Sequence, residues 1–243
     1  MVYFKSRTGP PHSKHLSRRE ALLVFGAAGA ALGFGCGGDS PASPSATTPT
    51  PTTPATGTAA ACAVMPAETV GPYPSHANLF RSDIRDGRSG TTLALTISVV
   101  NTNSSCNPVS GASVGVWQCD AAGNYSEYGT QTAQSYLRGI QTTDSNGRVT
   151  FTTIYPGWYQ GRATHIHVEV VRNGVPSKVT QIAFPESVNA AVYATGVYAS
   201  RGSNPTANAR DGIFADSLDS ETASVSGDAT NGYTATFRVG IAA

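Results

Sequence analysis

The sequence has few charged residues, because Asp, Glu, Lys and Arg together make up 13% of its 243 residues. Coiled coils and highly charged disordered proteins need far more charge, so both classes are excluded. The charge is also uneven: the first 20 residues hold five basic side chains against Glu20 alone, which leaves the rest of the chain mildly acidic. An acidic body of this kind argues against a nucleic-acid partner.

Long apolar runs are scarce as well. Residues 21–35 form an uncharged, mostly apolar stretch of 15 residues, whereas a membrane-spanning helix needs about 20. A basic segment followed by a short apolar one is typical of an export signal. The pair Arg18-Arg19 in front of it resembles the twin-arginine signal of bacteria.

Cys36 follows this apolar stretch in what looks like a loose lipoprotein cleavage box. It is either the residue to be lipidated, which would make a membrane tether, or it lies near an ordinary cleavage site. Residues 1–36 are therefore predicted to be a twin-arginine-type or lipoprotein-like leader. The mature protein is expected to be exported to the cell envelope or the extracellular space.

The next segment lacks any charge or aromatic residue. Residues 40–60 contain five Pro, seven Thr and three Ser, and such a composition buries nothing that would repay the entropy of ordering it. Residues 37–61 are therefore predicted to be a flexible linker rich in Pro, Thr and Ser. Residues 62–243 remain, and they suffice for one domain with a hydrophobic core.

The remaining sequence shows the pattern of β-strands. Leu93, Leu95, Ile97 and Val99 alternate with smaller residues, as in a strand with one buried face. Only 186–195 resembles a helix. Many short strands separated by Gly- and Pro-containing turns predict an all-β fold, an antiparallel β-sandwich with few short helices. The further candidate strands are 112–119, 149–154, 165–171, 179–184 and 232–241.

Cysteines are few, and three of them, Cys62, Cys106 and Cys119, lie in the predicted domain. In an oxidising compartment the expected arrangement is one disulfide with one thiol left over. We favour a bond from Cys62 to either Cys106 or Cys119, and the alternative is that all three are buried thiols. Their spacing does not match a metal site.

His165-Ile166-His167 lies in one of the predicted strands. Residues i and i+2 of a strand share a face about 6.6–6.8 Å apart, so both imidazoles can converge on one metal ion. The alternative is a pair of half-exposed histidines on the solvent face of the sheet. Tyr125 and Tyr159 follow nearby turns, and because a phenol has a pKa of about 10, a phenolate ligand favours the strongly Lewis-acidic Fe(III).

Four segments together resemble, in order, the intradiol ring-cleavage dioxygenases, the family of protocatechuate 3,4-dioxygenase and catechol 1,2-dioxygenase. The resemblance runs from about residue 68 to residue 216. It implies a β-sandwich with a mononuclear non-haem Fe(III) held by two Tyr and two His. The segments are 68–73 (ETVGPY), 114–126 (VGVWQCDAAGNYS), 143–147 (TDSNG) and 151–167 (FTTIYPGWYQGRATHIH).

Matched position by position, this resemblance assigns a role to six side chains. The ligand matching Tyr159 leaves the iron when substrate binds, and Tyr159 then acts as a base. Tyr128 or Tyr136 remains an alternative to Tyr125, and Arg162 could instead be a surface residue paired with an acid. The implied metal ligands are Tyr125, Tyr159, His165 and His167, and the implied catalytic residues are Arg162, Gln181 and Tyr159.

The resemblance implies an enzyme that cleaves catechol-type rings with O₂ to cis,cis-muconate-type diacids, in the catabolism of aromatic compounds. The predicted leader makes it an exported bacterial member of that family. Neither NAD nor flavin is required. Two other interpretations remain open: a non-catalytic β-sandwich that binds carbohydrate or mediates adhesion on a tethered lipoprotein, and a zinc or copper enzyme that uses His165 and His167. A zinc or copper site is poorly supported, because few other Cys or His ligands accompany this pair.

Overall fold

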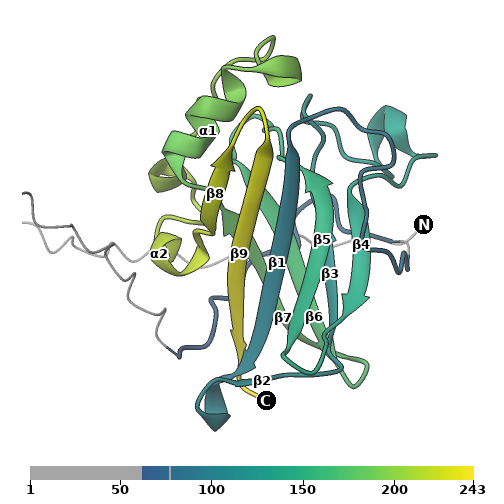
Figure 1. Cartoon of the computed structure of the whole chain (residues 1–243), viewed down its shortest axis with the longest axis vertical. Coiled ribbons are helices and arrows are strands. Elements are labelled where there is room, and N and C mark those ends of the chain that lie inside the picture. Colours follow the sequence, from purple (N-terminus) through teal and green to yellow (C-terminus); the bar gives the residue numbers. More distant parts are fainter. Residues whose placement is uncertain (1–61, 77) are drawn as a thin grey trace, which may run out of the picture. The chain divides into compact units, whose positions relative to one another are not determined.

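The computed structural model describes residues 62–76 and 78–243, and the predicted leader (1–36) and linker (37–61) lie outside them. No helix in this described part is long and apolar enough to cross a membrane. The strands form two sheets, which Figure 1 shows one behind the other. The predicted all-β sandwich with few short helices is therefore confirmed.

The front sheet in Figure 1 has five strands in the order β2-β1-β9-β8, with β5 also paired to β1. The second sheet has four strands in the order β4-β3-β6-β7. The bounds of the first sheet's strands are β1 Thr92–Asn101, β2 Asn107–Pro108, β5 Arg148–Ile154, β8 Ser224–Asp228 and β9 Gly232–Ile241, and those of the second are β3 Ser113–Trp117, β4 Arg138–Thr142, β6 His165–Arg172 and β7 Val175–Ala183.

Helices are short and lie outside the sheets. The predicted helix at 186–195 is confirmed as α1 (Glu186–Tyr193), which begins directly after Pro185 because proline suits a helix start. A second helix, α2, covers Leu218–Glu221. The single 3₁₀ turns are η1 Thr102–Ser104, η2 Gly129–Gln131, η3 Gly196–Tyr198 and η4 Asn208–Arg210.

The pairing of β1 with β9 departs from the antiparallel prediction, because these two strands run parallel from Leu93↔Tyr233 to Asn101↔Ile241. Every other ladder between the named strands is antiparallel. A parallel pair needs a long connection, and here most of the chain lies between its two strands. Three short strands, β2, β4 and β8, were not predicted, since none of them shows polar residues in regular alternation with apolar ones.

The inner faces of the two sheets form one core. Leu93, Leu95 and Ile97 of β1 meet Ile166 and Val168 of β6 in the same buried cluster. Their alternation along each strand places the intervening residues on the outer faces. In β6 the outer face begins with His165 and His167 and continues with Glu169.

The disulfide joins Cys62 to Cys106, with 5.7 Å between the Cα atoms. The expectation that Cys62 forms the bond is confirmed, and its partner is the cysteine in the turn between β1 and β2. Cys119 is a buried thiol. The bond ties the first described residues to one end of the five-stranded sheet.

Candidate active site

The two histidines at the start of β6 lie close together and are shielded from solvent. His165 is 3% exposed and His167 is 0% exposed, so they do not lie on an open solvent face. Their Nε2 atoms are 3.2 Å apart. The Nδ1–H of His165 donates to the carbonyl oxygen of Ala163 at 2.7 Å, which leaves Nε2 as the nitrogen with a free lone pair.

Aromatic rings and a tight backbone segment hold His167 in place. The indole of Trp117 stacks on the imidazole with 4.9 Å between ring centroids and an interplanar angle of 2°. Gly71 approaches the same ring with φ +72°, and a Cβ atom there would lie 3.0 Å from Cε1 of His167. Glycine therefore fits this position both for its backbone conformation and for its size.

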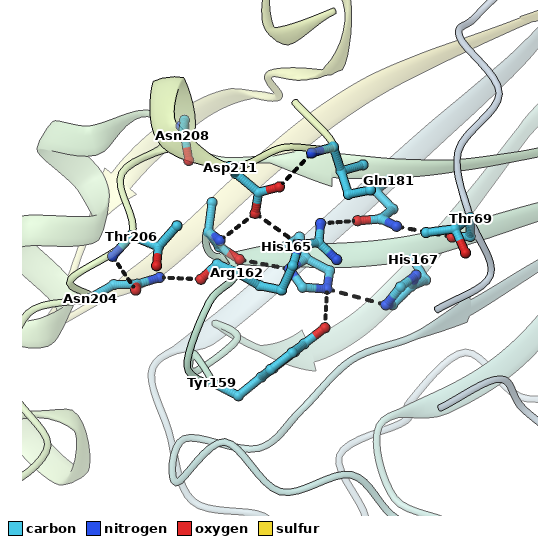
Figure 2. Close-up of polar contacts among 12 residues, drawn as sticks. Thr69, Tyr159, Arg162, His165, His167, Gln181, Asn204, Thr206, Asn208 and Asp211 are labelled. Atoms are coloured by element: carbon cyan, nitrogen blue, oxygen red, sulfur yellow. Dashed lines mark hydrogen bonds and ion pairs between the residues drawn. The ribbon is translucent and has the colours of Figure 1, made fainter. Parts of the chain in front are cut away.

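Two tyrosines converge on the histidine pair. The hydroxyl of Tyr159 lies 3.3 Å from Nε2 of His165, as Figure 2 shows. The ring of Tyr125 lies 5.8 Å from that of Tyr159 and 6.3 Å from that of His167, centroid to centroid. The Tyr125 hydroxyl is buried and has no hydrogen-bond partner among the described residues, although buried hydroxyls nearly always have one.

The alternative tyrosines point elsewhere. The hydroxyl of Tyr128 donates to the carbonyl oxygen of Pro74 at 2.9 Å and lies 2.7 Å from Nε2 of His76, a loop residue as expected. The hydroxyl of Tyr136 lies 3.4 Å from the carboxylate of Asp120. Both phenols are thus engaged outside the histidine pair, so the geometry favours Tyr125 as the second oxygen donor.

Burial controls the protonation of these groups. It lowers the pKa of His165 to about 4 and lowers that of His167 well below its usual value, with the positive charge of Arg162 adding to both effects. Both imidazoles are therefore neutral at neutral pH and carry a free lone pair. Burial also raises the pKa of the phenols of Tyr125 and Tyr159, against the opposing charge of Arg162.

Arg162 and Gln181 lie beside the histidines and contact each other. The Nη2 of Arg162 donates to the Oε1 of Gln181 at 2.5 Å, and the Nε2 of Gln181 donates to the carbonyl oxygen of Thr69 at 3.0 Å. The Nε of Arg162 donates to Asp211 at 2.9 Å. Figure 2 shows the guanidinium between Gln181 and Asp211. Arg162 is thus paired with an acid and is part of the site at the same time.

The two imidazoles and two phenols of His165, His167, Tyr125 and Tyr159 fit a metal ion. Imidazole nitrogens bind at about 2.0–2.1 Å, so two that share one ion at right angles lie about 3 Å apart, close to the 3.2 Å between His165 and His167. The partnerless hydroxyl of Tyr125 supplies a donor that its protein surroundings do not use. Among the described residues, no group of three or more His, Cys, Asp or Glu could hold a metal, so such a site depends on the tyrosines.

Three residues that build this site were not predicted from the sequence. Tyr73 stacks on Tyr125 with 4.6 Å between centroids, and it lies within a motif that was noted for other reasons. Arg138 is buried and donates to the carbonyl oxygens of Ser126 at 2.6 Å and Tyr73 at 3.1 Å. Asp211 is buried in a loop. Neither Arg138 nor Asp211 stands in a pattern that distinguishes it from a surface charge.

The chain is similar in sequence to known proteins. Residues 69–203, more than half of the chain, match the profile of the family Dioxygenase_C, described as dioxygenase. The chain is 33% identical over 115 residues to catechol 1,2-dioxygenase of Candida albicans, a match that spans 38% of this chain and only 38% of that relative's length.

Solved structures agree with this match. An intradiol ring-cleavage dioxygenase from Tetranychus urticae has a TM-score of 0.67 and 30% identity, over 74% of this chain and 95% of that one. The dioxygenase domain of a dioxygenase carbohydrate-binding protein fusion from Streptomyces sp. SirexAA-E has a TM-score of 0.57 and 28% identity, over 73% of this chain and 97% of that one. The chain therefore belongs to the intradiol ring-cleavage dioxygenase family.

Proposed function

We propose that this protein cleaves catechol-type rings with O₂ between their two hydroxyl-bearing carbons, giving cis,cis-muconate-type diacids in the catabolism of aromatic compounds. The observation that carries the proposal is the convergence of two neutral imidazoles and two phenols at the start of β6. One of these phenols, Tyr125, has a buried hydroxyl that is not hydrogen-bonded within the described residues.

The residues that would hold a non-haem Fe(III) are Tyr125, Tyr159, His165 and His167. A bound ferric ion supplies Lewis acidity, which lowers the pKa of both catechol hydroxyls and of the two ligating phenols. The low pKa of each imidazole keeps it ready to bind without first losing a proton. The donor set favours ferric iron over zinc or copper, because phenolates are hard oxygen ligands.

Tyr159 is suited to accept a substrate proton. It is only partly buried, whereas Tyr125 is buried, so an incoming ring reaches Tyr159 more easily. The phenolate of Tyr159 would be a strong base, and it would take the proton of one catechol hydroxyl at its own oxygen. The charge of Arg162 favours the ionised form of Tyr159.

Arg162 and Gln181 would bind and orient the substrate. The guanidinium lies beside Tyr159 and Gln181, where it can stabilise negative charge that develops on the substrate ring. The amide of Gln181 is held at both ends, by Arg162 and by the carbonyl of Thr69. An amide fixed in this way can position a polar substrate atom without a cost of reorganisation.

We propose in addition that the enzyme is exported, and that lipidation of Cys36 tethers it to the membrane. The basic segment, the Arg18-Arg19 pair and the position of Cys36 after a short apolar stretch support this. Mass spectrometry of protein from the membrane fraction of the native host tests it. A lipid on Cys36 is expected, and an intact N-terminus in the cytoplasm would contradict export.

The deciding experiment combines metal analysis, visible spectroscopy and an O₂ electrode on protein purified from iron-replete cells. We expect about one iron per chain, a visible tyrosinate-to-iron absorption band that shifts when catechol is added, and O₂ uptake with catechol. A colourless protein that neither binds added Fe(III) nor consumes O₂ would instead support the carbohydrate-binding or adhesion module. Stoichiometric zinc or copper would also overturn the proposal.

A further inference from the structure

The chain beyond residue 203 lies outside the region that matches the family profile, yet it reaches the site. Asp211 follows η4 and is 0% exposed. Its Oδ2 accepts hydrogen bonds from the Nε of Arg162 at 2.9 Å and from the backbone N–H of Ala163 at 2.5 Å. Its Oδ1 accepts from the N–H of Ile213 at 2.8 Å. This carboxylate therefore holds Arg162 from the side opposite Gln181, as Figure 2 shows.

Two of the nitrogen donors of Arg162 each have a fixed partner. Nε is occupied by Asp211 and Nη2 by Gln181, so the guanidinium plane is fixed by two partners. The amide of Asn204 also donates to the carbonyl oxygen of Arg162 at 3.0 Å. A guanidinium on a flexible stem has many rotamers, and anchoring at Nε removes most of them before substrate binds.

The carboxylate of Asp211 is also connected to His165 by two hydrogen bonds through Ala163. The N–H of Ala163 donates to Asp211, and the carbonyl oxygen of Ala163 accepts from Nδ1–H of His165 at 2.7 Å. A hydrogen bond at one ring nitrogen sets the tautomer and the orientation of a histidine ligand. Asp211 thus steadies the turn from which both Arg162 and His165 project.

Asp211 carries its charge at neutral pH. Burial alone would raise the pKa of its carboxyl, but the N–H groups of Ala163 and Ile213 and the cation of Arg162 outweigh burial and lower it. A buried carboxylate with one cationic partner and two backbone donors is a fixed counter-charge rather than a solvated surface group.

We propose that Asp211 is a positioning residue for ring cleavage, which holds the guanidinium of Arg162 in its productive orientation and steadies the Ala163 peptide next to His165. This inference rests on the proposed function. It also means that the segment from Asn204 to Asp216 is part of the active-site structure.

A double-mutant cycle tests whether Asp211 acts through Arg162. With catechol and an O₂ electrode, Asp211→Asn is expected to lower kcat by about 10- to 100-fold with a smaller change in KM, because misplaced groups cost rates of this order. In the Arg162→Ala background the same substitution should lower kcat by a clearly smaller factor, because only the effect through the Ala163 peptide remains. An equal loss in both backgrounds would overturn the proposal.

A control variant separates positioning from simple anchoring of the segment. The exposed carboxylate of Glu186 accepts from the backbone N–H of Asn208 at 2.6 Å and has no recorded contact with Arg162. Glu186→Ala should loosen the same segment and leave kcat within about 2-fold of the wild type. A loss as large as that of Asp211→Asn would show that only the anchoring of the segment matters.

A measurement without turnover keeps the inference separate from the proposed function. Hydrogen–deuterium exchange of the full-length protein, read at the Ala163 amide by mass spectrometry, should be slow in the wild type and in Arg162→Ala. It should be faster in Asp211→Asn, and Asp211→Glu, which keeps the charge, should recover part of the protection. Unchanged exchange in Asp211→Asn would contradict the inference, whereas absent O₂ uptake by the wild type would contradict only the function.

Discussion

Strands β1 and β6 have the same period of two, but their outer faces differ. The outer face of β1 is partly open to solvent, and Thr96 there pairs with Thr150 of β5 through hydroxyls 3.0 Å apart. The outer face of β6 is buried at its start, where His165 and His167 lie. One strand serves the core alone, and the other carries polar groups into a second buried region.

This difference shows which part of the fold contains buried polar groups that lower its stability but can serve catalysis. Buried polar atoms without a hydrogen bond cost free energy, so they are rare in native proteins. Among the described side chains such atoms belong to Trp117, Tyr125, His167 and Asn208, and none of them lies in the five-stranded sheet. Three of the four, Trp117, Tyr125 and His167, lie together in the site.

The largest effect should come from removing a donor on β6. His167→Ala is expected to abolish iron binding and the visible band and to lower O₂ uptake with catechol by more than about 1000-fold, since the donor set acts as a unit. Metal analysis and an O₂ electrode measure this. Thr96→Ala on β1 is the matched control and should leave both unchanged. Retention of full activity by His167→Ala would remove the functional contrast between the strands.

Breaking the Cys62–Cys106 disulfide tests whether the stability of the five-stranded sheet is independent of the site. The bond closes a loop with a sequence separation of 44, for which chain entropy gives about 4 kcal/mol. Thermal unfolding of the metal-free protein with and without dithiothreitol should show a fall in stability of up to this size, and a Cys62→Ser variant, which needs no reductant that could act on Fe(III), should keep the iron band at low temperature. Loss of the band before unfolding would show that the two regions are not independent.

Two buried tyrosines offer a finer comparison. Tyr125→Phe removes a hydroxyl that has no hydrogen-bond partner among the described residues, so it should leave the free energy of unfolding of the metal-free protein nearly unchanged while it removes or shifts the visible band. Tyr155→Phe removes a hydroxyl that donates to Asn189 at 2.7 Å and should cost about 1 kcal/mol with no change in the band. Denaturant unfolding and absorption spectra distinguish the two. The opposite pattern would show that Tyr125 is not a metal ligand.

The smallest effect concerns Cys119, which lies just beyond β3. Burial raises the pKa of its thiol to about 12, so the thiol stays protonated and shielded at pH 8. Iodoacetamide should fail to label Cys119 in the folded protein between about pH 7 and pH 9 and should label it after unfolding. Mass spectrometry of peptides distinguishes it from Cys36. Rapid labelling in the folded state would show that this end of the sheet opens.

Much of the fold followed from local pattern. The alternation in β1 and in residues 232–241 predicted strands that the structure confirms, and the predicted helix at 186–195 is α1. The short strands β4 and β8 escaped prediction, because neither has an apolar face long enough to show a period. The parallel pairing of β1 with β9 also escaped it, since strand direction depends on the route of the chain between them.

The candidate site was likewise predicted in part from the sequence, and the rest of it was shown only by the structure. The sequence by itself placed His165 and His167 on one face of a strand, and motifs shared with the family named Tyr125, Tyr159, Arg162 and Gln181. Spacing along the chain cannot show that the Tyr125 hydroxyl lacks a partner among the described residues while that of Tyr128 has one, because hydrogen bonding depends on contacts between distant segments.

Only the tertiary structure identified Asp211, which lies 49 residues after Arg162 and contacts it across the fold. The identity and alternation of side chains are local properties, and the sequence therefore determined the strands and the donor types. Burial, orientation and the pairing of charges depend on segments that meet only after folding, and for this reason the structure alone decided which donors stay free and what holds Arg162 in place.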